Sequence, residues 1–443
     1  MSRARKWLGN AGVVLALIAG LAVWTMLPWF AVLALVVALV LWLLLTRNGR
    51  LTLEAARIGI ASLPQRWGAS SVIVVGIAGV VGVLVAMLAM GAGFEATLKQ
   101  TGNDSTAIIL RGGSQAETNS VITRDQVPLV SALAGIARGA DGRPAVSPEL
   151  SQVVNMVTRA DHTDANAQLR GVGDAAWALR PQVKIVEGRR FEPGKRELVI
   201  GQGARKQYVD QQFNDLKPGT QIELANQVWT VVGFFASGDS HDSELWADAE
   251  TLASTYRRTA YQSITVRLDG KDGFNKLKAA MAADPRLKLD VDTTRHYYAK
   301  QSEQLSGFLK VLGIVIGAIM AVGAVFGALN TMYAAVAGRA REIATMRAIG
   351  FRGLPVVVAV MLETMLLALI GGLIGGLIAW LVFNGYSVST LGNNFSQVMF
   401  QFKVSPDLLW NGIKWALGIG LVGGLFPALR AARLPVTEAL RAA

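Results

Sequence analysis

The residues best suited to do chemistry lie in one polar segment, residues 237–244, SGDSHDSE. Its histidine, His241, lies among three acidic residues, and nitrogen and oxygen ligands of these kinds can hold a divalent metal ion. A polar loop that follows a strand explains the same composition equally well. Ser240 and His241 are not a nucleophilic pair, because neighbouring side chains of an extended segment point apart and no glycine elbow surrounds the serine. We therefore assign no catalytic and no metal-binding residue.

Two glycine-containing segments could cradle a phosphate. Residues 188–196, GRRFEPGKR, approach the pattern of a phosphate-binding loop, but their glycines are one residue too far apart, and Arg196 replaces the hydroxyl residue that would hold magnesium. In residues 201–206, GQGARK, Lys206 stands where a dinucleotide fingerprint needs its third glycine. We therefore expect this chain to bind no cofactor and to be no enzyme by itself.

Composition indicates an integral membrane protein. Of the 443 residues, 52% are hydrophobic and only 17% are charged, and there is no cysteine, which excludes disulfides and thiolate sites. The formal net charge is +12, yet residues 94–303 contain 26 basic and 26 acidic side chains, so the excess lies in short segments beside the apolar runs. That distribution follows the positive-inside rule and argues against nucleic-acid binding.

Six apolar runs are long enough to cross a bilayer as helices. The first two form an additional N-terminal hairpin over residues 1–46, with a break at Pro28. If the helices alternate in direction, the basic clusters all face the cytoplasm, both termini are cytoplasmic, and residues 94–305 lie in the periplasm. We expect a multi-pass protein of the bacterial inner membrane. The predicted spans are residues 8–26, 30–46, 71–93, 306–335, 355–383 and 409–429, with a periplasmic loop at 384–408 and a cytoplasmic tail at 430–443.

The exported part is large enough for its own core, and its pattern is mixed α/β. Its outer elements predict one subdomain, into which a second, about residues 165–255, is inserted. The predicted fold is thus a membrane α-helical protein of six spans with a large mixed α/β periplasmic domain of two subdomains. The predicted strands lie at 107–110, 152–158, 197–200, 221–224, 229–235, 263–268 and 287–292, with helices after Thr123 and at 273–283.

Residues 47–70 predict an amphipathic helix along the inner membrane interface before the third span. Arg57, Arg66 and Trp67 are residues of the kind that hold such a helix in the interface. A simple anchor is the interpretation that we favour, and an elbow that gates movement is the alternative.

A short charged segment at residues 336–354 separates two apolar runs. Its arginines would be very costly inside lipid, so it must lie at the membrane surface. Apolar residues recur in it with helical spacing, and a glycine follows as a helix stop. We therefore predict a short amphipathic helix that a partner contacts. The candidate contact residues are Arg339, Arg341, Glu342, Met346, Arg347 and Gly350.

Glycines four residues apart mark two of the predicted spans. Gly371 with Gly375, and Gly372 with Gly376, would let helix backbones approach closely, either within one chain or between two copies. The fourth span has two further pairs, Gly313 with Gly317 and Gly323 with Gly327.

Glu363 is the one acidic residue inside a predicted span. An ionisable residue in a membrane either serves a function, such as relaying protons, or is paired. We favour a structural bond to the arginine-rich segment.

Two segments, 330–332 (NTM) and 341–350 (REIATMRAIG), precede an apolar helix that contains Glu363 and a pair of glycines. Together with the end of the chain, they resemble the permease core shared by MacB, FtsX and the lipoprotein-releasing proteins LolC and LolE. The resemblance covers residues 51–443 and leaves the N-terminal hairpin as an addition. The matching segments are 330–332 (NTM), 341–350 (REIATMRAIG) and 424–441 in the core, with 187–201 and 217–234 similar to the family's periplasmic core domain.

The resemblance implies the permease subunit of an ABC transporter that works by mechanotransmission. Residues 336–354 would then be the coupling helix, which docks on a separate cytoplasmic ATPase that is present in two copies and binds ATP and Mg. A second permease copy or a related permease, an adaptor or effector in the periplasm and membrane lipid are the other implied partners. The implied function is efflux or extraction of an envelope substrate. An FtsX-like relay that activates a periplasmic enzyme, and a secondary transporter with Glu363 as proton carrier, are the alternatives.

Overall fold

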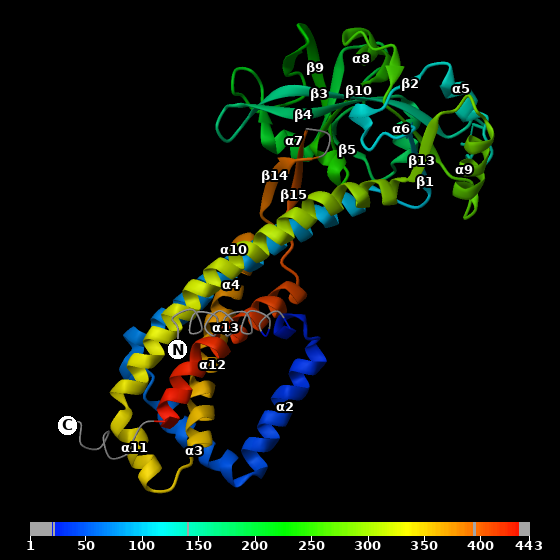
Figure 1. Ribbon diagram of the computed structural model, residues 1–443. Helices are drawn as coiled ribbons and strands as arrows, with labels where there is room; N and C mark the ends of the chain where they lie inside the picture. The colour runs from blue at the N-terminus through cyan, green and yellow to red at the C-terminus, as the bar shows by residue number, and fades with distance from the viewer. Residues whose placement is uncertain (1–19, 21–22, 140, 393–395, 434–443) are drawn as a thin grey trace, which may run out of the picture. The chain divides into compact units, whose positions relative to one another are not determined.

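The structure is a computed structural model of the chain, and it describes residues 20, 23–139, 141–392 and 396–433 (Figure 1). The chain divides into two compact units, which we call the helical unit and the sheet unit. The helical unit comprises Met1–Met90, Leu309–Gly385 and Lys403–Ala443, and the sheet unit comprises Gly91–Phe308 and Tyr386–Phe402.

Long apolar helices make up the helical unit. Among the described residues, four helices are long and apolar enough to cross a membrane, and α2 with α3, a pair bent by 97°, is a fifth if it counts as one span. These four coincide with the last four predicted spans. The predicted second span coincides with α2, and the first lies largely outside the described residues. The helices are α2 (Trp29–Leu45), α3 (Arg47–Ala61), α4 (Trp67–Thr101), α10 (Thr294–Gly338), α11 (Ala340–Ala348), α12 (Gly353–Phe383) and α13 (Pro406–Arg433).

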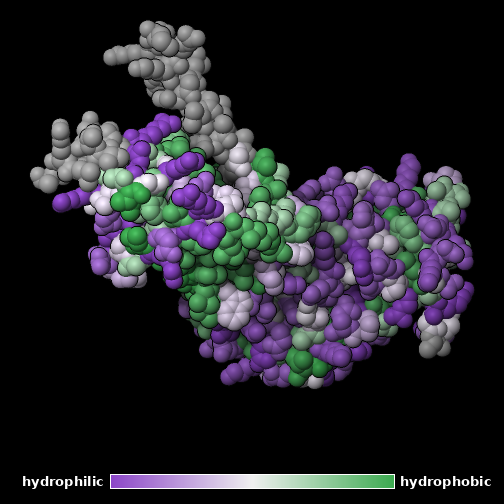
Figure 2. All heavy atoms as spheres, turned by 90° about the horizontal axis from the view of Figure 1, so that it is seen from below, coloured by the Kyte–Doolittle hydropathy of each residue, from purple (hydrophilic) through white to green (hydrophobic). Residues whose placement is uncertain are grey.

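The surface of the helices is apolar, unlike that of the sheet unit. Hydrophobic side chains gather on the helices, whereas mainly hydrophilic side chains cover the sheet unit (Figure 2). Large apolar residues such as Val311, Phe326 and Leu381 are more than half exposed. Contiguous exposed apolar surface of this extent is expected where lipid replaces water.

The predicted helix over residues 47–70 is interrupted in the structure. α3 ends at Ala61, a 3-10 turn (η1, Pro64–Arg66) follows, and α4 already begins at Trp67. Pro64 is consistent with the break, because proline lacks the backbone N–H that would continue the hydrogen-bond pattern of α3. The segment is therefore α3, the turn η1 and the start of α4, and not one continuous helix.

One face of α3 packs on protein. Ala55 and Ala56 form a buried cluster with Ala359 of α12, and Gly49, Thr52 and Gly59 are buried as well. Small side chains on this face let the two helices approach closely. α3 is thus packed against α12 and is more than a membrane anchor.

The four glycines of α12 are used for packing within the chain. A Cβ added to Gly371 or Gly375 would lie 2.8 or 2.3 Å from backbone carbonyl oxygens of α4. A Cβ added to Gly372 or Gly376 would lie 2.7 or 3.3 Å from side-chain carbons of α13. At Gly371, Gly372 and Gly375 a side chain would force the helices apart, whereas at Gly376 the end of a leucine side chain could move aside. The glycines thus let α12 pack closely on α4 and α13.

The glycine pairs of α10 differ from one another. A Cβ added to Gly313 or Gly317 would lie 2.9 or 3.0 Å from side-chain carbons of α4, whereas one added to Gly323 or Gly327 would meet nothing within 4 Å in the part of the chain that the structure describes. The first pair packs within the chain, and the second pair leaves an open strip on α10.

Lys414 ties the N-terminal segment to α13. Its Nζ donates to the carbonyl oxygens of Thr25 at 2.6 Å and Leu27 at 3.3 Å, and Trp24 Nε1 donates to the carbonyl oxygen of Lys414 at 2.7 Å. Carbonyls at the end of a helical turn carry partial negative charge, so a buried ammonium is well placed there.

The sheet unit is built on an eleven-stranded mixed sheet. The order of its main path is β13-β1-β12-β3-β4-β10-β6-β9-β5, in which β10 is parallel to β4 and β6 is parallel to β9. Its strands are β1 (Thr106–Arg111), β3 (Val146–Thr158), β4 (Asp164–Val172), β5 (Lys184–Gly188), β6 (Glu197–Gly201), β7 (Tyr208–Val209), β8 (Gln221–Leu224), β9 (Gln227–Ala236), β10 (Glu244–Asp248), β12 (Ser263–Arg267) and β13 (Leu289–Thr293).

Short helices and turns complete the sheet unit. β2 pairs with β11 in a separate two-stranded sheet. The predicted helix after Thr123 is α5, and the N–H of Thr123 donates to the Oε1 of Gln126, its first residue, at 3.1 Å. The remaining elements are η2 (Glu117–Asn119), β2 (Ile122–Thr123), α5 (Gln126–Ser131), α6 (Asp174–Leu179), α7 (Gln202–Gln207), η3 (Ser240–Ser243), α8 (Ala249–Thr255), β11 (Ala260–Tyr261) and α9 (Gly273–Ala283).

The strand β3 joins the two groups of elements that the sequence separates. Its first half pairs with β12, where Glu149 lies opposite Ser263, and its second half pairs with β4, where Leu150 lies opposite Gly171. The hydrogen-bonded path is therefore continuous across the predicted boundary at residue 165. The change from one group to the other falls inside β3.

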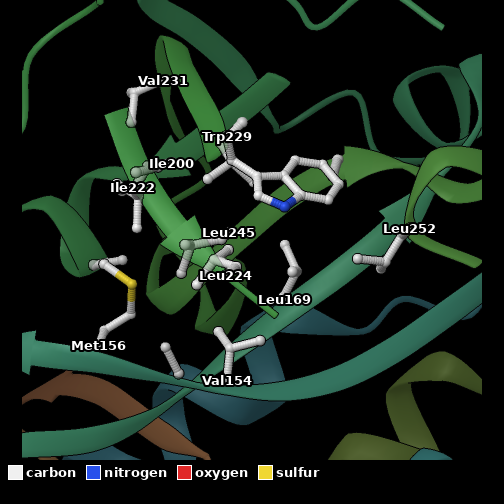
Figure 3. Packing of buried hydrophobic residues seen from close by; sticks show 14 of the residues in the cluster. Val154, Met156, Leu169, Ile200, Ile222, Leu224, Trp229, Val231, Leu245 and Leu252 are labelled. Atoms are coloured by element: carbon white, nitrogen blue, oxygen red, sulfur yellow. The ribbon is translucent and has the colours of Figure 1, made fainter. Parts of the chain in front are cut away.

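Each group nevertheless has its own hydrophobic cluster. One cluster packs α5 and α9 against β1 and β12, with Ile109 and Leu277 fully buried. The other contains Trp229, Leu169 and Leu245, whose side chains point toward one another from β9, β4 and β10 (Figure 3). Burial of this much apolar surface is the main force that holds each group together.

Five charged side chains are buried inside the sheet unit, and we call them the sheet-unit cluster. Arg170 bonds Glu117 at 2.8 Å, Glu149 at 2.9 Å and Glu244 at 2.9 Å, and Arg180 bonds Glu149 at 2.6 Å. Burial by itself would raise the pKa of Glu149, but Arg180 and Arg170 outweigh burial and lower its pKa to about 2. Glu149 therefore remains ionised at neutral pH.

A β-hairpin lies within the predicted periplasmic loop, residues 384–408. It consists of β14 (Ser387–Leu391) and β15 (Gln397–Gln401) and belongs to the sheet unit. Gly392 and the polar residues after it, placed between two short segments that contain β-branched and aromatic residues, are a hairpin signal in the sequence.

Candidate functional site

The helix α11 ends at a left-handed glycine, as its sequence predicts. Gly350 has a φ of 109°, a conformation that residues with a Cβ avoid. Its N–H donates to the carbonyl of Arg347 at 3.2 Å, and the N–H of Phe351 donates to the carbonyl of Met346 at 3.1 Å. These two bonds form a Schellman motif, which fixes where α11 stops and α12 starts.

The inner face of α11 is apolar and packs on the helical unit. Ile343 and Ala344 are buried, and Met346 and Phe351 pack against the cluster formed by α3 and α12. Met346, which the sequence assigned to partner contact, therefore lies on the inner face. Its spacing from Ile343 marks the face that folds back on the chain.

The outer face of α11 is exposed, and we call it the coupling face. It combines a cation, an anion, a hydroxyl and two apolar side chains. Of the apolar side chains, that of Ile349 is 72% exposed. A surface that combines these groups can offer both polar and apolar contacts to another protein. The coupling face consists of Arg341, Glu342, Thr345, Ala348 and Ile349.

Glu363 of α12 holds three segments together, and with its two partners it forms the helical-unit cluster. Its Oε2 lies 3.1 Å from Arg339 Nη1, and its Oε1 lies 3.0 Å from Arg66 Nη2. The bond to Arg339 is the one expected from sequence. The bond to Arg66 was not expected, because Arg66 was assigned to a membrane anchor.

Gly59 of α3 makes room for this cluster. A Cβ at that position would lie 2.8 Å from Glu363 Oε2 and 3.3 Å from Arg339 Nη1. A larger residue would therefore push the carboxylate away from its partners. The three elements that meet here are α3, the start of α11 and α12.

A chain of charges connects the buried cluster to the coupling face. Arg339 donates from Nε to Glu342 Oε2 at 3.0 Å while its Nη1 bonds Glu363. The side chain of Glu363 is 4% exposed, that of Arg339 is 11% exposed and that of Glu342 is 56% exposed. A partner that displaces Glu342 therefore changes the environment of Glu363.

The polar segment 237–244 is used for the local fold. Asp239 Oδ1 accepts the N–H of His241 at 2.9 Å, and Asp242 Oδ1 accepts the N–H of Ser237 at 2.6 Å. Among the described residues, no group of three His, Cys, Asp or Glu side chains is placed to hold a metal ion. The loop interpretation accounts for these acidic residues, which cap the turn η3.

Two family models match the chain. The MacB-like periplasmic core domain matches residues 70–284, and the FtsX-like permease C-terminal domain matches residues 314–436. The chain belongs to the MacB/FtsX-like ABC transporter permeases. Together with the four apolar helices, the matches identify the permease as a membrane protein with an extracellular domain. The second model includes α11, α12 and most of α10 and α13, so the coupling face and Glu363 lie in its permease part.

Known relatives of the permease differ in length. The macrolide export ATP-binding/permease protein MacB of Vibrio parahaemolyticus is 26% identical over 318 residues, which cover 67% of this chain and 45% of that protein. The uncharacterized ABC transporter permease YknZ of Bacillus subtilis is 24% identical over 416 residues, which cover 88% of this chain and 99% of that one. The permease thus spans less than half the length of MacB.

One solved structure overlaps with part of the permease. The periplasmic region of MacB from Actinobacillus actinomycetemcomitans covers 44% of this chain and 91% of its own, at 15% identity and a TM-score of 0.34. A score this low adds nothing to the family assignment.

Proposed function

We propose that the permease passes the work of a cytoplasmic ATPase to its exported sheet unit, for efflux or extraction of an envelope substrate. The ATPase is a separate subunit, present in two copies, and it binds the ATP and Mg. The permease itself is non-catalytic. It lies in a bacterial inner membrane with α11 and both termini on the cytoplasmic side.

The coupling face is the observation that carries this proposal. It is exposed, it stands on a helix whose start and stop are fixed, and it connects through Arg339 to Glu363 in the membrane part. A docking helix must transmit displacement, and a buried ion pair that joins three segments is suited to that task. The likeness to the Bacillus permease, matched over 99% of its length, supports an ATPase on another chain.

Reversal of charge on the coupling face tests the proposal. The permease is purified in nanodiscs with its co-purifying ATPase, and Arg341→Glu is combined with Glu342→Lys. We expect the ATPase to dissociate or its hydrolysis to lose dependence on the permease, because several contacts at the centre of an interface are lost together. Recovery of the permease in the membrane should be unchanged.

The matched control reverses another exposed cytoplasmic pair. Arg57 and Glu54 form an ion pair on α3 with side chains 78% and 64% exposed. Arg57→Glu with Glu54→Lys should leave the association with the ATPase intact. Equal loss in both double variants, or normal association in both, contradicts the assignment of α11.

We propose in addition that a second copy of the permease, or a related permease, packs on α10. A Cβ added to Gly323 or Gly327 would meet no described residue within 4 Å, although the equivalent pair Gly313 and Gly317 packs on α4. Such a pair is suited to helix–helix contact in a bilayer. Gly323→Leu with Gly327→Leu should therefore shift the dimer toward the monomer in light scattering, without loss of folded protein.

The arrangement of Glu363 supports mechanotransmission over proton transport. A proton carrier must release its proton to water, but this carboxylate is only 4% exposed and is bonded to two arginines. Efflux and an FtsX-like relay share the same mechanical step. A periplasmic adaptor recovered with the permease supports efflux, and a periplasmic hydrolase recovered with it supports the relay.

A further inference from the structure

Segments that continue into four membrane helices meet at one short turn of the sheet unit, η3. The first is α4, which ends at Thr101. The hydroxyl oxygens of Thr101 and Ser240 lie 2.9 Å apart, and the N–H of Ser240 donates to the hydroxyl oxygen of Thr101 at 3.0 Å. Both side chains are buried, so this contact excludes water.

The second segment is the start of α10. The ring of Tyr298 lies edge-on to the ring of His241, with 6.2 Å between centroids, and His241 also contacts Trp246 at 5.9 Å. His241 is 1% exposed, and its Nδ1 lies 2.8 Å from Asp239 Oδ1. The imidazole is thus enclosed between α10, β10 and its own turn.

The third segment is the hairpin β14–β15, whose ends continue into α12 and α13. The N–H of Met399 donates to Ser243 Oγ at 2.7 Å. Beside this bond, Phe400 packs edge-on against Phe94 of α4 with 5.4 Å between centroids, and Ser396 Oγ lies 3.3 Å from Gln168 Oε1 of β4. The hairpin is therefore seated on the sheet and on α4.

The turn that receives these contacts is held firmly in place. Asp239, the N-cap of η3, accepts the N–H of His241, and Asp242 of η3 accepts the N–H of Ser237 before the turn. After the turn, Trp246 Nε1 donates to Glu244, which belongs to the sheet-unit cluster. Three of the four residues of η3 contact different segments. A turn this short and this fully bonded cannot take up three independent displacements.

We propose that η3 is a mechanical junction, at which movements of α4, α10 and the β14–β15 hairpin are combined and passed to the sheet as one rigid body. The inference deepens the proposed function, on which its mechanical role rests. It adds a connection between α12, α13 and the exported domain through the hairpin, besides the one that the long helices provide.

Hydrogen exchange of the full chain in lipid nanodiscs tests the junction without any ATPase. Ser243→Ala removes the acceptor for the N–H of Met399. We expect amide exchange to rise about fivefold in the hairpin, and also at the end of α4 and the start of α10, because loss of one buried hydrogen bond raises local opening by about that factor. Ser240→Ala should raise exchange in the same three segments.

The matched control is Ser389→Ala. The Oγ of Ser389 bonds Gln397 Oε1 at 3.1 Å on the exposed part of the same hairpin. This variant loses an equivalent bond without touching η3, so exchange should change only within the hairpin. If Ser243→Ala also affects the hairpin alone, the three contacts are independent and the junction is refuted.

A reversible cross-link tests the rigidity of the junction in the complex with ATPase. The chain has no cysteine, so Thr101→Cys with Ser240→Cys introduces the only two thiols. A junction that moves as one body should keep its ATP hydrolysis when this pair is oxidised. Loss of hydrolysis on oxidation, with recovery in dithiothreitol, overturns rigidity. Failure of the coupling-face experiment would refute the proposed function, yet the exchange experiment would still decide whether the junction exists.

Discussion

The helical-unit cluster and the sheet-unit cluster use the same charge chemistry in different surroundings. In the helical unit, Glu363 bonds Arg66 and Arg339, whose side chains are 22% and 11% exposed, and Arg339 also reaches the exposed Glu342. In the sheet unit, no member of the five-residue cluster has a side chain more than 9% exposed. The first cluster ends at a surface, and the second is closed.

Because of this difference, the helical-unit cluster can respond to a partner, whereas the sheet-unit cluster only stabilises the fold. A charge that is bonded to an exposed neighbour can be perturbed by a partner, whereas a closed network has one satisfied arrangement. The helical-unit cluster also joins three helical segments, which can shift as bodies. The sheet-unit cluster joins three neighbouring strands, which the sheet already holds in register, to η2 and the end of α6.

Arg170→Met should therefore have the largest effect of the variants considered. It leaves three buried carboxylates with only Arg180 as a cationic partner, and loss of one partner from a buried ion pair costs about 3–5 kcal/mol. We expect this loss in the free energy of unfolding of the sheet unit, measured by hydrogen exchange of β3, β4 and β10 in the full chain.

Arg258→Met is the control for that variant. Arg258 donates to Gln152 at 2.9 Å on the exposed surface of the sheet unit. Its replacement should change the free energy of unfolding by no more than about 0.5 kcal/mol. A loss as small for Arg170→Met would show that the cluster reorganises and is not closed.

Local pattern predicted much of the helical unit but not its ion pairs. The four long spans follow from apolar run length, and the stop of α11 follows from Gly350, because both signals lie within a few neighbouring residues. The bond between Arg66 and Glu363 joins residues 297 positions apart. No periodicity encodes such a pairing, so Arg66 was assigned to lipid.

The same limit explains the errors at the candidate site and in the sheet unit. The apolar spacing of Ile343 and Met346 correctly predicted an amphipathic helix, but it could not say whether that face meets a partner or the chain itself. The alternating pattern predicted most strands, yet the division of β3 between β12 and β4 depends on long-range pairing. Strands β4, β5 and β10 were missed, because β10 directly follows a polar turn and the residues of β4 and β5 are mostly polar or small.

Glu363→Gln should have an intermediate effect, which tests the open character of the helical-unit cluster. The neutral amide no longer compensates Arg66 and Arg339, but these side chains can turn toward water, so we expect a loss of about 1–3 kcal/mol. Thermal unfolding of the permease in nanodiscs measures this loss. Glu54→Gln, at an exposed position of α3, is the control. Continued ATP hydrolysis in Glu363→Gln would exclude a proton-carrier role. A loss equal to that of Arg170→Met would show that this cluster is closed as well.

Arg124→Met should have the smallest effect, because it removes an ion pair that is open to water. Arg124 Nη2 lies 2.9 Å from Glu250 Oε2, with side chains 46% and 59% exposed. Exposed pairs contribute less than about 1 kcal/mol and are screened by salt.

The pH dependence of that small loss has a definite sign. The hydrogen bond from Arg124 lowers the pKa of Glu250 from its ordinary value of 4.5, so the pair stabilises the fold above that pH. The contribution is lost as the pH falls below 4.5 toward the lowered pKa, since the carboxyl is then protonated in both states. Wild type and Arg124→Met should therefore differ slightly at pH 7 in low salt, and they should converge in acid and in high salt.

A difference that persists under both conditions would mean that packing on Tyr261, over whose ring the guanidinium lies at 5.1 Å, outweighs the charge. The burial of each ion pair would then not be enough to rank the stability losses at the three sites.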